Sequence, residues 1–103
     1  MTVFYSLKND DKELVIKVHG RFDFALQKEF HDSYDDLEPQ PQHCTVDLEH
    51  TTHLDSSALG TLLVLREKLG KKVPIKIINS RPEIERVLKA AGFEKLFELN
   101  YRE

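Results

Sequence analysis

Two adjacent hydroxyl residues follow an aspartate in the segment LDSSALG, residues 54–60. Asp55, Ser56 and Ser57 are all residue types that cap the start of a helix, where a side-chain oxygen accepts a hydrogen bond from a free backbone amide. A hydroxyl at a helix start is also well placed for phosphorylation, because the free amides and the macrodipole tolerate an anion there. The segment therefore predicts a capped helix start, a phosphorylation site, or both together.

Three histidines close to this segment raise two other possibilities. His50 and His53 have the spacing of metal ligands, with His43 nearby, but no CxxC or HExxH motif accompanies them. A hydrolase would use Ser56 as nucleophile and His53 as base, yet the chain has neither a G-x-S-x-G elbow nor a glycine-rich oxyanion loop. Glycine patterns that bind nucleotides are missing as well. We therefore expect no metal, no cofactor and no enzymatic activity.

The composition is that of one small globular domain spanning residues 1–103, with 40% hydrophobic and 32% charged residues. The net charge of -3 lacks the basic excess that nucleic-acid binding rewards. No apolar stretch approaches the length of about 20 residues that a membrane helix needs, and the start of the chain does not resemble a secretion signal. We expect a cytoplasmic protein without nucleic-acid partners or direct membrane insertion, with Cys44 as a buried core residue.

Apolar residues alternate with polar ones over residues 13–19, 44–48 and 73–77, which predicts three strands with one dry face each. Residues 3–7 form a weakly signalled additional strand. The HTTH segment at 50–53 is typical of a turn, and Asn79 is expected to begin another. Residues 96–99 form an apolar closing element whose type the pattern does not decide.

Three helices are predicted between these strands. The first has Asp23 as N-cap and ends near Leu37, because Pro39 and Pro41 cannot continue it. The second runs from Ser56 or Ser57 to Leu69, with Gly70 terminating it. The third follows a capping box formed by Ser80 and Glu83 and ends at Gly92. Its predicted buried face consists of Ile84, Val87, Leu88 and Ala91.

This alternation of strands and helices predicts an α/β fold with right-handed crossovers. We expect a single domain with a mostly parallel four- to five-stranded sheet. Because the strands show only one apolar face, the helices should lie mainly on one side of the sheet.

Several segments make the whole chain resemble the STAS family, named for sulfate transporters and anti-sigma factor antagonists. These landmarks are GRFDF at 20–24, VDL at 46–48, LDSSALG at 54–60 and AAGFEKLFEL at 90–99. In the antagonists of this family, the hydroxyl directly after the loop aspartate is phosphorylated, which implies Ser56 here, with Ser57 as the second choice. Ala58 departs from the family pattern, because many members have glycine there, and this stiffer helix start bears on which partner fits.

The resemblance implies a regulator that works by partner switching. The unphosphorylated protein would bind an anti-sigma factor or other partner protein, typically a serine kinase of the histidine-kinase-like ATPase type, and so free a sigma factor for transcription. Phosphorylation by that kinase would end the binding, and a metal-dependent serine phosphatase would restore it. The implied partner-binding residues are Asp23, Asp55, Ser56, Ser57, Gly60, Thr61 and Val64, and the last four of these residues are expected to form an exposed docking surface.

An alternative within the same family is a STAS accessory subunit of a membrane lipid ABC transporter. Such a subunit would not need a hydroxyl that can be phosphorylated. The Asp–Ser–Ser run at 55–57 therefore favours the switch.

Overall fold

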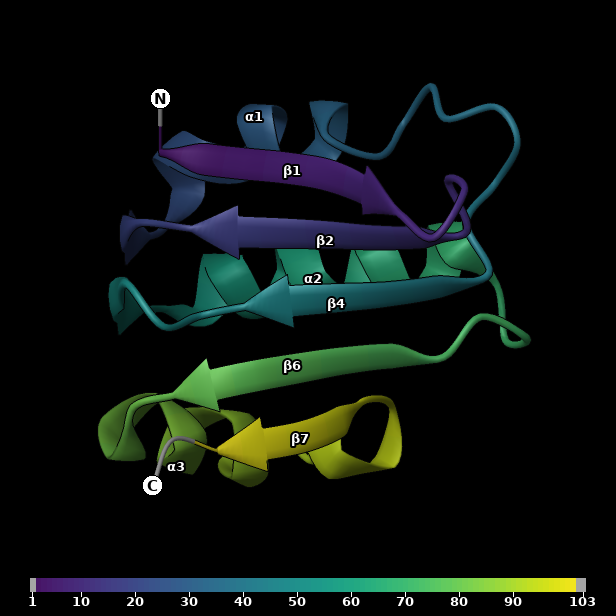
Figure 1. The fold of residues 1–103 in the computed structure, drawn as a ribbon. Coiled ribbons are helices and arrows are strands. Elements are labelled where there is room, and N and C mark those ends of the chain that lie inside the picture. Colours follow the sequence, from purple (N-terminus) through teal and green to yellow (C-terminus); the bar gives the residue numbers. More distant parts are fainter. Residues whose placement is uncertain (1, 102–103) are drawn as a thin grey trace.

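The computed structural model describes residues 2–101, and its centre is a five-stranded sheet in the order β1-β2-β4-β6-β7 (Figure 1). These strands are β1 (Val3–Lys8), β2 (Glu13–Val18), β4 (His43–Asp47), β6 (Ile75–Ser80) and β7 (Glu98–Tyr101). Only β1 and β2 are antiparallel neighbours, joined as a hairpin, and the other three pairs are parallel. The predicted α/β fold with a mostly parallel sheet is confirmed.

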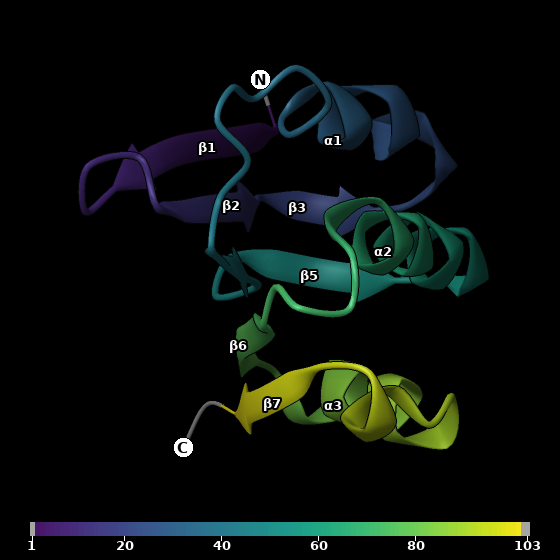
Figure 2. The ribbon, with the colours of Figure 1, turned by 90° about the vertical axis from the view of Figure 1, so that its right-hand side faces the viewer.

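The helices all cover the same face of this sheet (Figure 2). They are η1 (Phe24–Leu26), α1 (Gln27–Asp32), α2 (Ser56–Leu69), α3 (Pro82–Ala90) and η2 (Phe93–Lys95). Their apolar sides meet the inward residues of the strands in one core, to which β2 contributes the fully buried Leu14, Ile16 and Val18. Within residues 2–101, no helix has the length and apolar character needed to cross a bilayer.

Two short strands extend the architecture toward the start of α2. β3 (Gly20–Phe22) and β5 (Thr51–Leu54) pair in parallel as a separate two-stranded sheet. The predicted turn at 50–53 is therefore wrong. The buried Thr51 hydroxyl donates to the Val18 carbonyl over 2.8 Å, and this contact between distant segments holds the residues extended.

The first helical segment is shorter than predicted. Asp23 is an N-cap, as expected, but of the short η1. α1 ends at Asp32, well before Leu37, and turns follow it. The Ser33 hydroxyl donates to the Phe30 carbonyl at 2.6 Å, and the Ser33 amide binds the same oxygen. These bonds to residue i−3 replace the helical i−4 pattern and tighten the chain into turns.

The segment before α3 also differs from the prediction. β6 runs from Ile75 to Ser80, so Asn79 lies within the strand, where its φ of 64° is left-handed. No capping box forms, because Arg81 takes the N-cap position and the buried Ser80 hydroxyl has no hydrogen-bond partner within the described residues. On α3 itself, Ile84 and Leu88 are buried as predicted.

Two further core predictions have opposite outcomes. Ala91 is exposed, since the α-helix has already ended at Ala90. Cys44 is 1% exposed, which confirms it as a core residue, and desolvation by burial raises the pKa of its thiol to about 12. The thiol is therefore neutral and protected at physiological pH.

Candidate functional site

The small sheet brings two aspartates to neighbouring positions. Phe22 and Leu54 are register partners at the ends of β3 and β5, and Asp23 and Asp55 directly follow them. The Asp55 amide donates to the Phe22 carbonyl at 3.4 Å, which continues the pairing beyond the strands. Two residues that are 32 positions apart in the sequence thus begin the two adjacent helical segments η1 and α2.

Asp55 is the N-cap of α2. Its backbone is extended, and its carboxylate accepts from the Ala58 amide at 3.1 Å and from the Ser57 hydroxyl at 2.7 Å. The Ser57 hydroxyl and then the Ala58 amide lower the pKa of the Asp55 carboxyl, because both donate to its ionised form. Asp55 therefore carries a negative charge at neutral pH beside the two serines.

The two serines of the segment differ in their surroundings. Ser57 is half-buried, and its hydroxyl is held by Asp55. Ser56 is exposed at the first position of α2, and no residue among 2–101 forms a hydrogen bond with its hydroxyl. Of the two predicted phosphorylation positions, Ser56 is thus the one with an exposed hydroxyl that no described residue binds.

The predicted docking surface on α2 is exposed only in part. Gly60 and Val64 are exposed, and Val64 keeps 40% of its surface in contact with solvent. The predicted exposure of Thr61 is wrong: it is 4% exposed, and its hydroxyl donates to the Ser57 carbonyl one turn earlier. Helical geometry explains the difference, because Thr61 lies on the same side as the buried Ala58 and Leu65, three residues before it and four after it.

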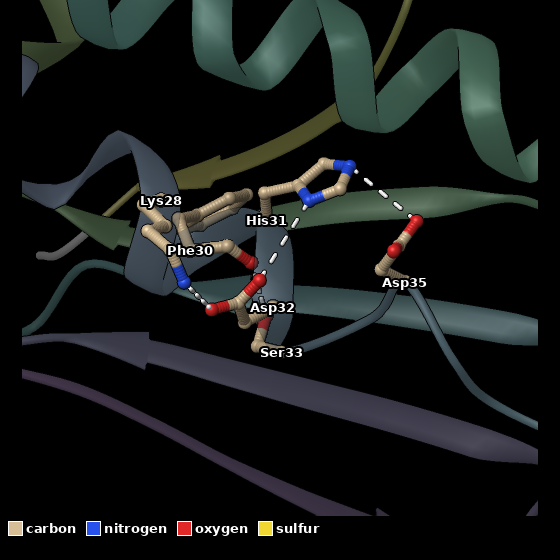
Figure 3. A network of polar contacts seen from close by, with 6 residues as sticks. All are labelled: Lys28, Phe30, His31, Asp32, Ser33 and Asp35. Carbon is tan, nitrogen blue, oxygen red and sulfur yellow. Dashed lines mark hydrogen bonds and ion pairs between the residues drawn. The ribbon is translucent and has the colours of Figure 1, made fainter.

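A groove of about 370 Å³ lies beside this surface, between α1 and α2. It is lined by Gln27, Lys28, His31, Tyr34, Thr61 and Val64. Figure 3 shows the polar contacts of the α1 wall, where Lys28 pairs with Asp32 at 2.8 Å and the two ring nitrogens of His31 face Asp32 and Asp35. The groove therefore joins charged side chains on α1 to the apolar Val64 on α2.

Phe24 is an exposed aromatic residue that was not predicted to belong to the site. It follows Asp23 in η1 and is 67% exposed, more than any other large hydrophobic residue described. The apolar spacing in this region draws attention to its neighbours Phe22 and Leu26, which are both buried. The spacing does indicate that Phe24 is exposed, because it lies two positions from each of these core residues and so on the other side of a helical segment.

The histidines near the segment are spread over β4, β5 and the turn between them. No group of three or more His, Cys, Asp or Glu residues within 2–101 is arranged to hold a metal ion. His53 is exposed, and no hydrogen bond between the described residues joins it to Ser56. His50 instead packs against His19, with ring centroids 4.7 Å apart.

The fold is that of a STAS domain. The family model "STAS domain" matches residues 5–103, and the chain therefore belongs to the STAS family. A STAS-domain containing protein of Pseudomonas aeruginosa (strain UCBPP-PA14) is 41% identical over 92 residues, which cover 88% of this chain and 91% of that protein.

Solved structures of the same fold include regulators and transporter domains. An anti-sigma factor antagonist from Mycobacterium paratuberculosis is 25% identical, with a TM-score of 0.76 over 95% of this chain and 85% of that one. The unphosphorylated anti-sigma factor antagonist SpoIIAA is 16% identical, with a TM-score of 0.71 over 94% and 86% of the two chains. The STAS domain of a SulP transporter from Vibrio cholerae is 21% identical, with a TM-score of 0.75 over 94% and 77%.

Proposed function

We propose that this chain is a partner-switching regulator of the anti-sigma factor antagonist type, controlled by reversible phosphorylation of Ser56. The observation that carries the proposal is the contrast at the start of α2, where Ser56 is exposed with a free hydroxyl while Asp55 holds Ser57. The likeness to the mycobacterial antagonist supports the same class. In this role the chain is a binding protein and a phosphorylation substrate, and it performs no catalysis of its own.

The proposed partner surface surrounds Ser56 on two neighbouring segments. It consists of Asp23, Phe24, Asp55, Ser57, Gly60 and Val64, with the buried Thr61 contributing only through the wall of the groove. Phe24 supplies the type of exposed aromatic anchor that dominates many interfaces. Asp55 places negative charge beside the helix start, and the nearby Asp23 carboxylate lies 3.6 Å from the Arg21 guanidinium. The surface therefore suits a partner with an apolar pocket and a basic rim.

Phosphorylation of Ser56 would add a further, larger negative charge to this surface. A phosphoserine carries about -1.5 to -2 charges at neutral pH. Pressed against a partner beside Asp55, the phosphate meets like-charge repulsion and must lose its water, which opposes binding. The proposed kinase is an anti-sigma factor of the histidine-kinase-like ATPase type, and a metal-dependent serine phosphatase would reverse the modification.

Phosphopeptide mapping after incubation with a candidate kinase and Mg-ATP tests this function. We expect phosphate on Ser56 in the wild type and in Ser57→Ala, and none in Ser56→Ala. Phosphate confined to Ser57, or incorporation unchanged in Ser56→Ala, would show that the assignment is wrong. Specific, stoichiometric binding to a purified ABC-transporter ATPase subunit in place of a serine kinase would instead support the accessory-subunit role.

A further inference from the structure

The first strand forms an edge of the sheet with unusually apolar side chains. β1 pairs with β2 on one side only and is the last strand at that end (Figure 1). Three of its large residues are exposed, at 43% for Phe4, 53% for Tyr5 and 37% for Leu7. Exposed apolar edge strands are templates for pairing with another strand, and proteins normally blunt them.

The hydrogen-bond pattern shows which backbone groups face outward. The His19 amide donates to the Thr2 carbonyl at 2.8 Å, one step beyond the register pair Val3 and Val18. Because hydrogen-bonded and non-hydrogen-bonded pairs alternate along an antiparallel ladder, Phe4, Ser6 and Lys8 bond to β2. The amides and carbonyls of Val3, Tyr5 and Leu7 therefore point away from the sheet.

Among the described residues, hydrogen bonds reach the outward amides only at the start of this edge. The Glu29 carboxylate of α1 accepts from the Val3 amide at 2.8 Å and from the Thr2 amide at 3.2 Å. This capping independently confirms that the Val3 amide faces outward. No hydrogen bond from residues 2–101 reaches the outward groups of Tyr5 or Leu7. The outward amides and carbonyls of Tyr5 and Leu7 therefore form an open stretch with two hydrogen-bond donors and two acceptors.

We propose that this open stretch of β1 pairs antiparallel with β1 of a second copy of the chain, with Ser6 of both copies on the two-fold axis. In this register Tyr5 lies opposite Leu7 of the second copy, and Leu7 opposite its Tyr5. Each copy satisfies the outward donors and acceptors of the other, so the contact is self-complementary. The result is a continuous sheet across the dimer.

The side chains fit the same register. Tyr5 and Leu7 lie on the helix-facing side of the sheet, opposite Ile16 and Leu14, so the pairing packs an aromatic ring on an aliphatic side chain twice. On the other face, Phe4 lies opposite Lys8 of the second copy, and no like charges meet.

Neighbouring registers are poorer. With the two-fold axis at Tyr5, Leu7 would lie opposite Val3 of the second copy, whose amide already donates to Glu29. An axis at Leu7 places Tyr5 against the turn at Asn9, whose φ of 54° is incompatible with a strand. The Ser6 axis alone uses both open residues.

Cysteine crosslinking tests the register directly. Two residues facing each other as a non-hydrogen-bonded pair are about 4.5 Å apart between Cα atoms, within the range of a disulfide. We expect Ser6→Cys to form a disulfide-linked dimer under mild oxidation. Phe4→Cys is the matched control, because it lies on the same exposed face, but its two copies would be separated by about 13 Å. The native Cys44 does not interfere, since it is buried.

The expected result is that Ser6→Cys crosslinks at least about tenfold faster than Phe4→Cys, whose separation exceeds what a disulfide spans. Sedimentation of the wild type over a range of concentrations should show a reversible dimer. Leu7→Pro should abolish that dimer with little change in melting temperature, because it removes an outward amide that the monomer does not use. Equal crosslinking of the two cysteine variants, or a wild type that stays monomeric at every concentration, would overturn the proposal. Neither measurement depends on Ser56 or its phosphorylation.

Discussion

Asp55 stabilises the start of α2 and also holds the Ser57 hydroxyl. Its carboxylate accepts from the Ser57 hydroxyl and the Ala58 amide, and both bonds favour the ionised form. Since folding lowers the pKa of this carboxyl, its stabilising contribution is present above the pKa of the unfolded chain. That contribution is lost as the pH falls through the lower folded pKa.

Asp55→Ala removes both the charge and the capping oxygen of this side chain, whereas Asp55→Asn removes the charge and keeps an oxygen. At pH 7 we expect both variants to melt below the wild type, with Asn the milder change because its amide oxygen still accepts hydrogen bonds. The difference between wild type and Asp55→Asn should shrink as the pH falls below about 4, the ordinary pKa range of Asp. Melting curves across the acid range measure this, and a difference that grows on acidification would contradict the role of the carboxylate.

Gly60 lies in the middle of α2, where glycine has a conformational cost. A Cβ at this position would meet nothing within 4 Å, and the residue is exposed. Gly60→Ala should therefore raise the free energy of unfolding by about 0.5–1 kcal/mol, which chemical denaturation measures.

Gly60→Arg is the matched probe of the docking surface. Its side chain projects from the same open position, so the fold should tolerate it, while a partner seated on the start of α2 would clash with it. We expect binding to the partner kinase to fall while the melting temperature stays near that of Gly60→Ala. Unchanged binding would remove Gly60 from the proposed surface.

Arg66 ties the end of α2 to two other segments. Its guanidinium donates to the carbonyls of Gly70, Val73 and Leu96, which belong to the helix end, the following loop and the residue after η2. Arg66→Ala should cost about 1.5–3 kcal/mol of unfolding free energy, since hydrogen bonds to a charged group are lost. Arg66→Lys should recover little, because an ammonium cannot reproduce the planar fork. Full recovery with Lys would indicate that the charge alone matters.

Phosphorylation of Ser56 should act on binding and leave the molecule as a whole folded. At a helix start the macrodipole favours an anion by about 0.3–1 kcal/mol, so the phosphate does not require refolding. A loss of about 4 kcal/mol at the interface would weaken a complex roughly a thousandfold. Ser56→Asp carries one charge and should be a partial mimic.

Melting temperature and partner affinity, measured together, test this separation. Wild type, Ser56→Ala, Ser56→Asp and the phosphoprotein should melt within a few degrees of one another, because about 1 kcal/mol shifts a domain of this size by roughly 4–8 °C. Their affinities should differ far more. A phosphoprotein that lost its tertiary structure, or bound the partner undiminished, would contradict the mechanism.

Local patterns in the sequence were enough to predict most of the architecture and the capped start of α2. Alternation identified the strands that form the inner sheet, and Asp55 marked the start of α2 with one residue's precision. Gly70 likewise marked the end of α2, whereas α3 ends at Ala90, two residues before Gly92. These features are the period of the side chains, the helix caps and the backbone freedom of glycine, and they depend on residues that are close in the chain. They can therefore be predicted from the sequence.

The tertiary structure alone decided how distant segments meet. Residues 50–53 resemble a turn, and become a strand only because β3, about thirty positions away, pairs with part of the segment. The failed capping box at Ser80 has the same cause, because Ser80 stays in β6, which pairs with β7. The early end of α1 is instead local, since Ser33 bonds to Phe30. The open edge at Tyr5 likewise depends on which surfaces other elements cover. The type and spacing of a residue do not show whether another element covers it, because this depends on how the whole chain packs.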